Sequence, residues 1–184
     1  MSKKVLVPIA EGTEEIEAVC IIDTLRRAGA EVMVVSVEAA RTVTCSRGVR
    51  IEADALIADC AGALYDLIAV PGGMPGAEHL RDNAALTDLL KQQRDAGRLY
   101  AAICAAPVVV LQTHGLLAGR RATCFPGFAA QLHNAVAANE RVVVDGNCVT
   151  SRGAGSAIEF ALALITLLYD AEKSAEVGAR MQAQ

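Results

Sequence analysis

The sequence predicts an α/β protein, a doubly wound sandwich in which a mostly parallel sheet lies between two layers of helices. Apolar runs that suit buried strands alternate with segments of helical periodicity along the chain. The first three elements have the lengths of a strand–helix–strand unit, which joins parallel strands by a right-handed crossover. With 184 residues, of which 53% are hydrophobic, the chain suits a single domain over residues 1–184 with a sizeable core.

The expected strands share short apolar runs, often β-branched, that are bounded by glycine, proline or polar turn residues. Such runs occupy residues 4–10, 31–37, 64–70, 98–103, 141–145 and 148–151, with a short hairpin over 42–51 and a short strand over 122–124. Because most of these runs are apolar throughout, they suit strands that are covered on both faces.

The expected helices carry apolar residues at intervals of three and four. They occupy residues 14–28, 84–96, 105–113, 128–138 and 156–169, and a polar helix ends near residue 181. Thr13 and Asn83 are placed as N-caps of the first two helices, and Gly29 and Gly97 end them. Residues 115–140 are the least regular part of the chain.

Composition argues against several classes of function. The net charge is −4 without a basic block, so no dedicated nucleic-acid surface is expected. No apolar segment suits a membrane span or a secretory signal. No nucleotide-binding glycine motif follows a strand, and no cofactor is expected. The cysteines lack metal-ligand spacing, which favours reduced thiols in a cytoplasmic protein without a metal site: Cys20, Cys45, Cys60, Cys104, Cys124 and Cys148.

Cys104 is the strongest candidate for a reactive residue. It ends an apolar strand, and two small residues and Pro107 follow it, a pattern typical of a sharp turn from strand to helix. Free N–H groups and aligned dipoles at a helix N-terminus favour a thiolate, so the pattern predicts a lowered pKa for Cys104. The alternative is a buried structural cysteine, since cysteine is among the most buried residue types.

Four segments follow predicted strands and are expected to meet at one edge of the sheet, where open α/β folds bind ligands. They are Glu11–Glu17, Pro71–Gly73, Cys104–Ala106 and Ser151–Gly155. The N–H groups of Gly72, Gly73 and Ala105 suit an oxyanion hole, which holds negative charge on a substrate oxygen or an oxidised sulfur. For the Pro-Gly-Gly segment the alternative is a plain turn.

Glu17 is the candidate partner of the cysteine. Its neighbours at three and four residues, Cys20 and Ile21, are apolar in character. A glutamate beside the core has a raised pKa, and a protonated carboxyl donates a hydrogen bond to a thiolate. The alternative is a solvated glutamate at a helix N-terminus, which is the expectation for Glu14 and Glu15.

The histidines are weak candidates for a general base. His79, His114 and His133 are the only three, and none is next to Cys104 in the sequence. A cysteine hydrolase needs a base within hydrogen-bond reach of its thiol. A cysteine amidohydrolase with a distant histidine is therefore the weakest of the functional hypotheses.

Five motifs in register over nearly the whole chain resemble the ThiJ/PfpI superfamily. Within it the chain looks closest to the branch of the Parkinsonism-associated protein deglycase and bacterial YajL. The motifs are Ala101–Pro107, Glu11–Glu17, Val70–Gly73, Cys45–Arg47 and Thr150–Gly155.

This resemblance implies a flavodoxin-like three-layer sandwich that forms a homodimer. It places the reactive cysteine at Cys104, its protonated glutamate partner at Glu17 and the backbone donors at Gly72, Gly73 and Ala105. Candidates for the site or the dimer seam are Glu14, Arg27, Arg47 and Cys45, and the apolar face of the first helix is a further candidate for the seam.

Members of this branch are described as deglycases, which remove methylglyoxal and glyoxal adducts from side chains, and as glyoxalases that yield hydroxy acids. The leading hypothesis is therefore that Cys104 attacks a dicarbonyl-derived carbon while Glu17 moves the proton, in protection against carbonyl and oxidative stress. The alternative, also implied by the resemblance, is a non-enzymatic redox sensor and holdase chaperone that works through oxidation of Cys104.

The sequence departs from relatives of this chain at two positions. Ala105 stands where the protease-like branch has a histidine, which argues against a peptidase triad. Phe125 stands where the deglycase branch often has a histidine before Pro126, which leaves Glu17 to move protons alone.

Overall fold

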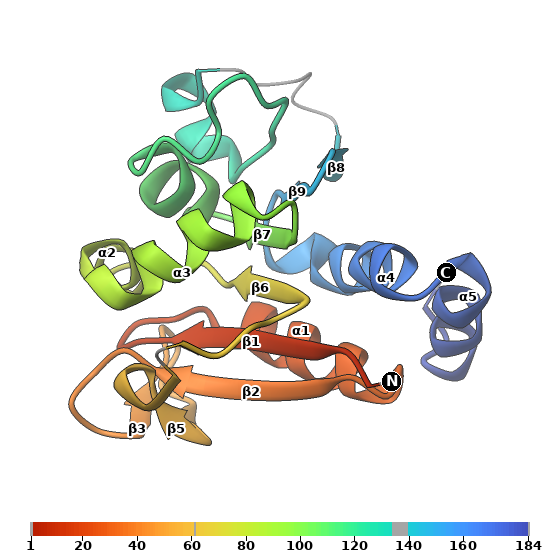
Figure 1. The fold of residues 1–184 in the computed structure, drawn as a ribbon, viewed down its shortest axis with the longest axis horizontal. Helices are drawn as coiled ribbons and strands as arrows, with labels where there is room; N and C mark the ends of the chain where they lie inside the picture. The colour runs from red at the N-terminus through yellow and green to blue at the C-terminus, as the bar shows by residue number, and fades with distance from the viewer. Residues whose placement is uncertain (1, 61, 134–139, 184) are drawn as a thin grey trace.

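The computed structural model describes residues 2–60, 62–133 and 140–183 as one α/β sandwich (Figure 1). Its central sheet has seven strands in the order β5-β2-β1-β6-β7-β9-β8, and only β8 runs antiparallel to its neighbour. The α/β class and the mostly parallel sheet are therefore confirmed. The strands are β1 (Lys4–Ile9), β2 (Glu31–Ser36), β5 (Ala55–Leu56), β6 (Leu67–Val70), β7 (Leu99–Ile103), β8 (Val142–Asp145) and β9 (Cys148–Ser151), and β3 (Thr42–Thr44) and β4 (Arg50–Glu52) form a separate hairpin.

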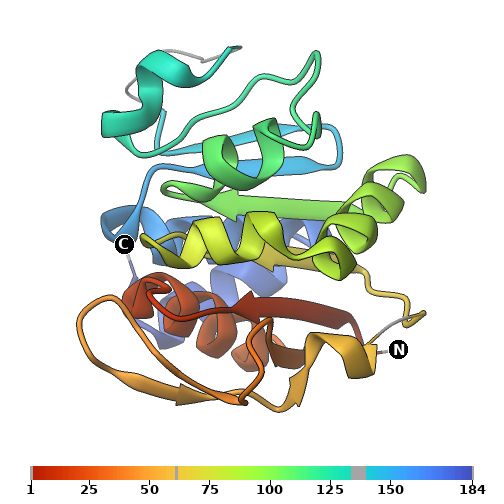
Figure 2. The same cartoon turned by 90° about the vertical axis from the view of Figure 1, so that its left-hand side faces the viewer.

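The helices cover both faces of the sheet. Figure 2 views the molecule from the side of α2 and α3, with the C-terminal helices behind the strands. None of the helices in the described ranges is both long and apolar enough to cross a membrane. The helices are α1 (Glu15–Arg27), α2 (Gly76–Asp82), α3 (Ala84–Asp95), α4 (Ala157–Leu168) and α5 (Ala171–Arg180), with shorter turns at Ile57–Cys60, Pro107–Gln112, Pro126–Gln131 and Ala154–Ser156.

The core has two halves because successive residues of each strand point to opposite faces. Val5 and Val7 of β1 pack with the buried residues of α1 and α4, whereas Leu6 packs with those of α2 and α3. In β7, Ala101 and Tyr100 divide in the same way. Both faces of the sheet are thus buried, which is why the strands read as continuous apolar runs.

The start of α1 differs from the sequence-based expectation. The side chain of Glu14 caps this helix by accepting the N–H of Glu17 at 2.8 Å. Thr13, the N-cap predicted from the sequence, instead accepts the N–H of Ala10 at 2.9 Å and holds the turn that leaves β1. Asn83 caps α3 as predicted, by accepting the N–H of Leu86.

Several short elements differ as well. Helix α2 is missing from the prediction because only Ala77 and Leu80 give it an apolar stripe, and β5 with the turn after it is missing too. The predicted strand 64–70 begins only at Leu67, the strand 122–124 shrinks to one bridging residue, and Pro107–Gln112 winds as a π-helix. Of the predicted helix 128–138, residues up to 131 form a 3₁₀-helix and 134–139 lie outside the described residues.

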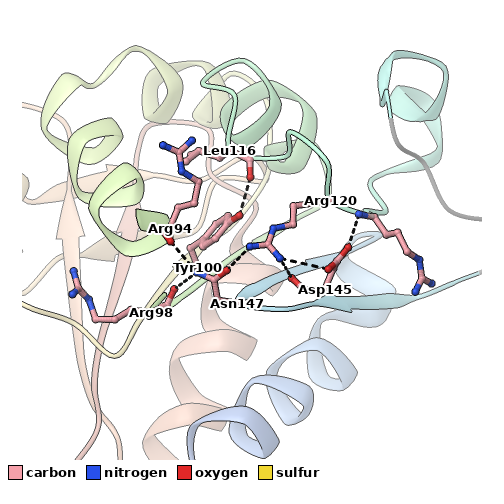
Figure 3. Close-up of polar contacts among 8 residues, drawn as sticks. Arg94, Arg98, Tyr100, Leu116, Arg120, Asp145 and Asn147 are labelled. Atoms are coloured by element: carbon pink, nitrogen blue, oxygen red, sulfur yellow. Dashed lines mark hydrogen bonds and ion pairs between the residues drawn. The ribbon is translucent and has the colours of Figure 1, made fainter. Parts of the chain in front are cut away.

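A polar cluster holds the β8–β9 turn (Figure 3). This turn lies beside the start of β7, whereas Cys104 follows the end of that strand. Arg120 donates a hydrogen bond to the side-chain oxygen of Asn147 at 2.8 Å, and Asn147 donates to the carbonyl of Arg98 at 2.9 Å. The buried hydroxyl of Tyr100 donates to the carbonyl of Leu116 at 2.8 Å. These bonds tie β9 to β7, so that the far ends of both strands emerge side by side.

The loops after β1 and β6 interlock through glycines. A Cβ atom on Gly73 would overlap the backbone of Gly12, Thr13 and Glu14, and one on Gly76 would overlap the backbone of Thr13. Gly73 also has a φ of +93°, in the region that favours glycine. The close approach of these two loops sets the distance between α1 and the end of β6.

Gly73→Ala and Gly29→Ala separate these two effects. Gly29 has a φ of +89° but open space where a Cβ would lie, so its replacement is expected to cost about 1 kcal/mol of unfolding free energy. Gly73→Ala is expected to cost at least about 2 kcal/mol more, because the new methyl group overlaps backbone. Urea unfolding of both variants measures the difference, and equal losses would contradict the interlocked loops.

Candidate active site

Four loops meet at the carboxyl edge of the sheet, as the sequence predicts. They follow β1, β6, β7 and β9, which are adjacent in the sheet. In the sheet, β2 lies on one side of β1, and the later strands β6 and β7 lie on its other side. The order of the strands therefore reverses between β1 and β6, which flank a switch point of the topology. Open α/β sheets bind their ligands at such a point.

Cys104 lies in a strained turn directly after β7. Its φ of +67° is uncommon for a residue other than glycine. Two backbone bonds hold this conformation: the N–H of Cys104 donates to the carbonyl of Ser151 at 3.0 Å, and its own carbonyl accepts the N–H of Phe125 at 2.8 Å. Cys104 is partly exposed and also packs against the half of the core that contains α1 and α4, so the strained backbone holds the thiol at the boundary between core and solvent.

Glu17 is buried beside this cysteine. The residue is 0% exposed, and its Oε2 accepts the N–H of Gly72 at 2.8 Å. Among the described residues Oε1 has no hydrogen-bond partner of normal geometry, and the carboxyl interacts with the Cys104 thiol. A Cβ on Gly72 would lie 2.6 Å from the Cβ of Cys104 and 2.9 Å from Oε2, so only glycine leaves room for this arrangement.

Burial shifts the pKa of both groups upward. Burial raises the pKa of Glu17 to about 7, against the lowering effect of the Gly72 N–H and the Cys104 thiol. Burial and then the charge of Glu17 raise the pKa of Cys104 to about 12, although the N–H groups of Ala105 and Gly73 lower it. The lowered Cys104 pKa expected from the sequence is therefore wrong, because the turn also removes the thiol from water and places a carboxylate beside it.

The two groups consequently act as one titrating pair. Near pH 7 the pair loses its first proton, that of Glu17, and the remaining proton stays on the sulfur until it is passed to Glu17 as the thiol reacts. When Glu17 holds it, the carboxylate charge that opposes the thiolate is gone. Glu17 is thus suited to accept the thiol proton as Cys104 attacks, and its pKa matches a base that works near neutral pH.

A cavity of about 370 Å³ opens beside this pair. The residues of the sequence-based site that line it are Glu14, Glu17, Arg47, Gly73, Cys104 and Ala105. Sequence reasoning missed four more lining residues: Ser46, Met74, Phe128 and Ala154. Ser46 and Ala154 lie within motifs that drew attention for other residues, whereas Met74 and Phe128 carry no signal beyond being apolar.

Other candidates lie elsewhere. Arg27 pairs with Asp23 at 2.6 Å at the far end of α1, and Cys45 is buried against the core. None of the three histidines lines the cavity, and the side chain of His114 instead contacts Thr87. This placement argues against the amidohydrolase hypothesis. A larger cavity of about 660 Å³ lies beside β2, and neither cysteine nor histidine lines it.

Glu15 is buried, in contrast to the solvated side chain expected from the sequence. Its carboxylate accepts the hydroxyl of Ser46 and the N–H of Arg47, both at 2.8 Å. The hydrogen bonds lower the pKa of Glu15 against the effect of burial. The β3–β4 turn is therefore fastened to the first turn of α1, which places Arg47 at the cavity.

The backbone donors divide into two groups. The N–H of Gly72 is taken by Glu17, so it does not serve the substrate oxygen as expected. The N–H groups of Gly73 and Ala105 instead act on the sulfur of Cys104. These two are the donors available to a negative charge that develops on an atom bound to that sulfur.

A strained cysteine after a parallel strand, with a buried carboxyl and backbone donors around its sulfur, defines a cysteine-centred α/β protein of the nucleophile-elbow kind. The profile of the DJ-1/PfpI family matches residues 3–167, and the chain belongs to this family. The recognition of the ThiJ/PfpI superfamily from sequence motifs is confirmed. The solved relatives share the flavodoxin-like fold.

Relatives of known sequence and structure resemble the chain over nearly its full length. It is 47% identical to "Protein DJ-1 homolog B" of Arabidopsis thaliana over 96% of the chain, which is 41% of that longer protein. It is 35% identical to "Glutathione-independent glyoxalase DJR-1.2" of Caenorhabditis elegans, over 94% of the chain and 91% of that protein. The structure "Toxoplasma gondii DJ-1, oxidized" superposes with a TM-score of 0.96 at 54% identity, covering 98% of both chains. The chain thus spans about half the length of the Arabidopsis relatives.

The raised pKa of Glu17 makes stability depend on pH. A folded-state pKa of about 7, against an ordinary value of 4.5, means that the folded protein holds this proton more tightly. The resulting stabilisation of the folded state is about 3 kcal/mol. It is fully present below pH 4.5 and is lost as the pH rises through 7. Glu17→Gln removes this dependence, so the wild type is expected to lose about 3 kcal/mol relative to the variant over that range.

Urea unfolding across this pH range measures the prediction. The matched control is Glu52→Gln, because Glu52 lies exposed on β4. Its stability curve is expected to run parallel to that of the wild type. A Glu17→Gln curve that is also parallel to the wild type would show that the carboxyl titrates normally.

Proposed function

We propose that this protein is a cysteine-dependent glyoxalase and deglycase that acts on methylglyoxal, glyoxal and their adducts with side chains, in protection against carbonyl and oxidative stress. The single observation that carries the proposal is the buried Glu17 carboxyl beside the thiol of Cys104, with one oxygen that has no hydrogen-bond partner among the described residues. The printed name of the Caenorhabditis elegans relative, a glutathione-independent glyoxalase, supports the same chemistry.

The proposed reaction begins when the sulfur of Cys104 bonds to the aldehyde carbon of methylglyoxal and its proton passes to Glu17. Negative charge then develops on the aldehyde oxygen, where the N–H groups of Gly73 and Ala105 stabilise it. Glu17 returns this proton to the oxygen, which completes a hemithioacetal, holds the substrate covalently on the enzyme and leaves Glu17 ionised again.

The second half of the reaction moves hydrogen within the substrate. Glu17 takes the proton from the carbon bound to sulfur and returns it to the neighbouring carbon. The hydroxyl proton of the first carbon passes to the ketone oxygen, and the adduct becomes a thioester of lactate. Water then cleaves the carbon–sulfur bond, and lactate and the free thiol of Cys104 are released. One substrate carbon is oxidised and its neighbour reduced, so no external oxidant or cofactor is needed.

The rest of the cavity fits a small carbonyl compound on a larger carrier. Met74 and Phe125 are partly exposed at the cavity, and Arg47 lies at the β3–β4 turn. The cavity of about 370 Å³ is larger than methylglyoxal needs, which leaves space for the end of a glycated side chain. The carrier is therefore expected to approach past Phe125.

Turnover of methylglyoxal to lactate tests the proposal. Cys104→Ala is expected to reduce the rate to that of the buffer alone, and Glu17→Gln to lower kcat/KM by about 10²- to 10⁴-fold. In the wild type kcat/KM is expected to rise with pH to a plateau, with a midpoint near 7 where the pair loses its first proton. Full activity in Cys104→Ala would exclude this mechanism.

A wild-type protein without turnover would contradict the proposal and favour the redox alternative. In that alternative Cys104 is oxidised to a sulfinate, and the free oxygen of Glu17 holds the oxidised sulfur through a shared proton.

We further propose a homodimer that forms through the exposed face of α1. Ile16 and Val19 are 54% and 48% exposed there, although both are large apolar residues. Sedimentation equilibrium is expected to give a dimer for the wild type and a monomer for Val19→Glu. The matched control is Val144→Glu on β8, where the replaced valine is 44% exposed, and it is expected to stay dimeric. A dimer that survives Val19→Glu would place the seam elsewhere.

A further inference from the structure

A chain of buried hydrogen bonds runs through two serines next to the site. The N–H of Gly153 donates to the hydroxyl of Ser156 at 3.2 Å, and the hydroxyls of Ser156 and Ser151 lie 2.8 Å apart. The hydroxyl of Ser151 donates to the carbonyl of Arg141 at 2.7 Å. Ser156 is 3% exposed and Ser151 is 0% exposed. Buried hydroxyls that satisfy each other in this way fix the backbone between them.

The backbone that they fix is the turn at Gly153. The N–H of Ser156 donates to the carbonyl of Gly153 at 2.8 Å, which closes the turn. A Cβ on Gly153 would lie 3.8 Å from Oε1 of Glu17 and 3.9 Å from the sulfur of Cys104. A side chain at this position would thus contact both members of the titrating pair, so the backbone of Gly153 runs directly beside them.

The same serines also reach Cys104 through the backbone. The carbonyl of Ser151 accepts the N–H of Cys104 at 3.0 Å, one of the two bonds that hold its strained conformation. The hydroxyl of Ser151 is held by Ser156 and by the carbonyl of Arg141. A change at Ser156 is thus transmitted both to the cover of the pair and to the turn that carries the thiol.

We propose that Ser156 is a positioning residue for the pair formed by Cys104 and Glu17. Its hydroxyl seats Gly153 against the pair and keeps water from the Glu17 carboxyl. Ser156 itself lines no part of the cavity and touches no substrate. The role rests on the proposed function only in that the same pair is the catalytic one.

The charges around Glu17 come from three directions. Glu14 lies on the same side at the start of α1 and opposes its ionisation, and Cys104 faces it from the end of β7. Arg47 lines the same cavity from the β3–β4 turn. The N–H groups of Gly72 and Ala154 favour the ionised form. Replacement of Ser156 changes none of these groups, so a shifted titration would report the loss of the cover.

The experiment measures alkylation of Cys104 by iodoacetamide against pH, with the Cys104 peptide quantified by mass spectrometry. In the wild type the rate is expected to rise with a midpoint near pH 7, where the pair loses its first proton. Ser156→Ala admits water to the carboxyl and is expected to lower this midpoint by about one pH unit. Ser156→Thr keeps a hydroxyl and is expected to restore the wild-type midpoint.

Ser174→Ala is the matched control. The hydroxyl of Ser174 donates to the carbonyl of Leu162 at 2.8 Å, where α5 packs on α4. Ser174→Ala removes one partly buried hydrogen bond that has only a structural role. It is therefore expected to leave the midpoint of Cys104 alkylation unchanged. An unchanged midpoint in folded Ser156→Ala would overturn the proposal.

A second measurement needs no variant. The amide hydrogen of Gly153 in the wild type is expected to exchange slowly with solvent, because Ser156 holds it. Exchange as fast as in an exposed loop would overturn the proposal even if Ser156→Ala does not fold. Neither measurement uses methylglyoxal. A protein that shows the shifted midpoint without turnover would contradict the proposed function and retain the role of Ser156.

Discussion

The burial of the Glu17 carboxyl is the constraint on which the site depends. A lone carboxylate away from water is strongly unfavourable unless it is hydrogen-bonded or protonated. Here one oxygen receives the N–H of Gly72, and the other has no hydrogen-bond partner of normal geometry in the part of the chain that the structure describes. The structure therefore satisfies half of the carboxyl and leaves the other half to a proton. Burial, which these hydrogen bonds offset only in part, raises the pKa of Glu17 to about 7 and makes the carboxyl useful as a base.

The small residues around the site follow from that burial. Gly72 has no room for a Cβ between Cys104 and Glu17, and Gly73 has none against the loop after β1. The backbone of Gly153 runs beside the pair, where a Cβ would contact both Glu17 and Cys104. Because these glycines bring loop backbone close to the pair and to the neighbouring loop, the pair is held by loops that are themselves fastened to the sheet. The interlocked loops, the bond between Ser151 and Cys104, and the cap from Glu14 to Glu17 all fix the same few atoms.

Much of the architecture could be predicted from the sequence because periodicity and turn residues are local signals. The apolar runs of β1 and β7, the cap at Asn83 and the meeting of the strand ends at one edge all agree with the structure. Helix α2 was not predicted because it has only two apolar residues facing the core. Thr13 is a good N-cap by type, but its hydroxyl is used within the preceding turn.

The site was only partly predictable. The strand-ending turn at Cys104 and the unusual neighbours of Glu17 identify the two central residues from sequence alone. The direction of the Cys104 pKa depends on burial and on the distance to a carboxylate, which no local pattern records. The same limit applies to Glu15, whose partners Ser46 and Arg47 lie more than thirty positions away along the chain. It applies equally to Gly72, whose N–H serves Glu17.

The most direct test of this account is the titration of the Glu17 carboxyl by NMR of ¹³C-labelled glutamate, with Glu17→Gln to assign the resonance. The account predicts a carboxyl that titrates near pH 7, well above its ordinary value of 4.5, in the protein without substrate. A midpoint close to 4.5 would show that Glu17 is an ordinary carboxylate at neutral pH. The shared proton, and the base that the proposed chemistry needs, would then both be absent.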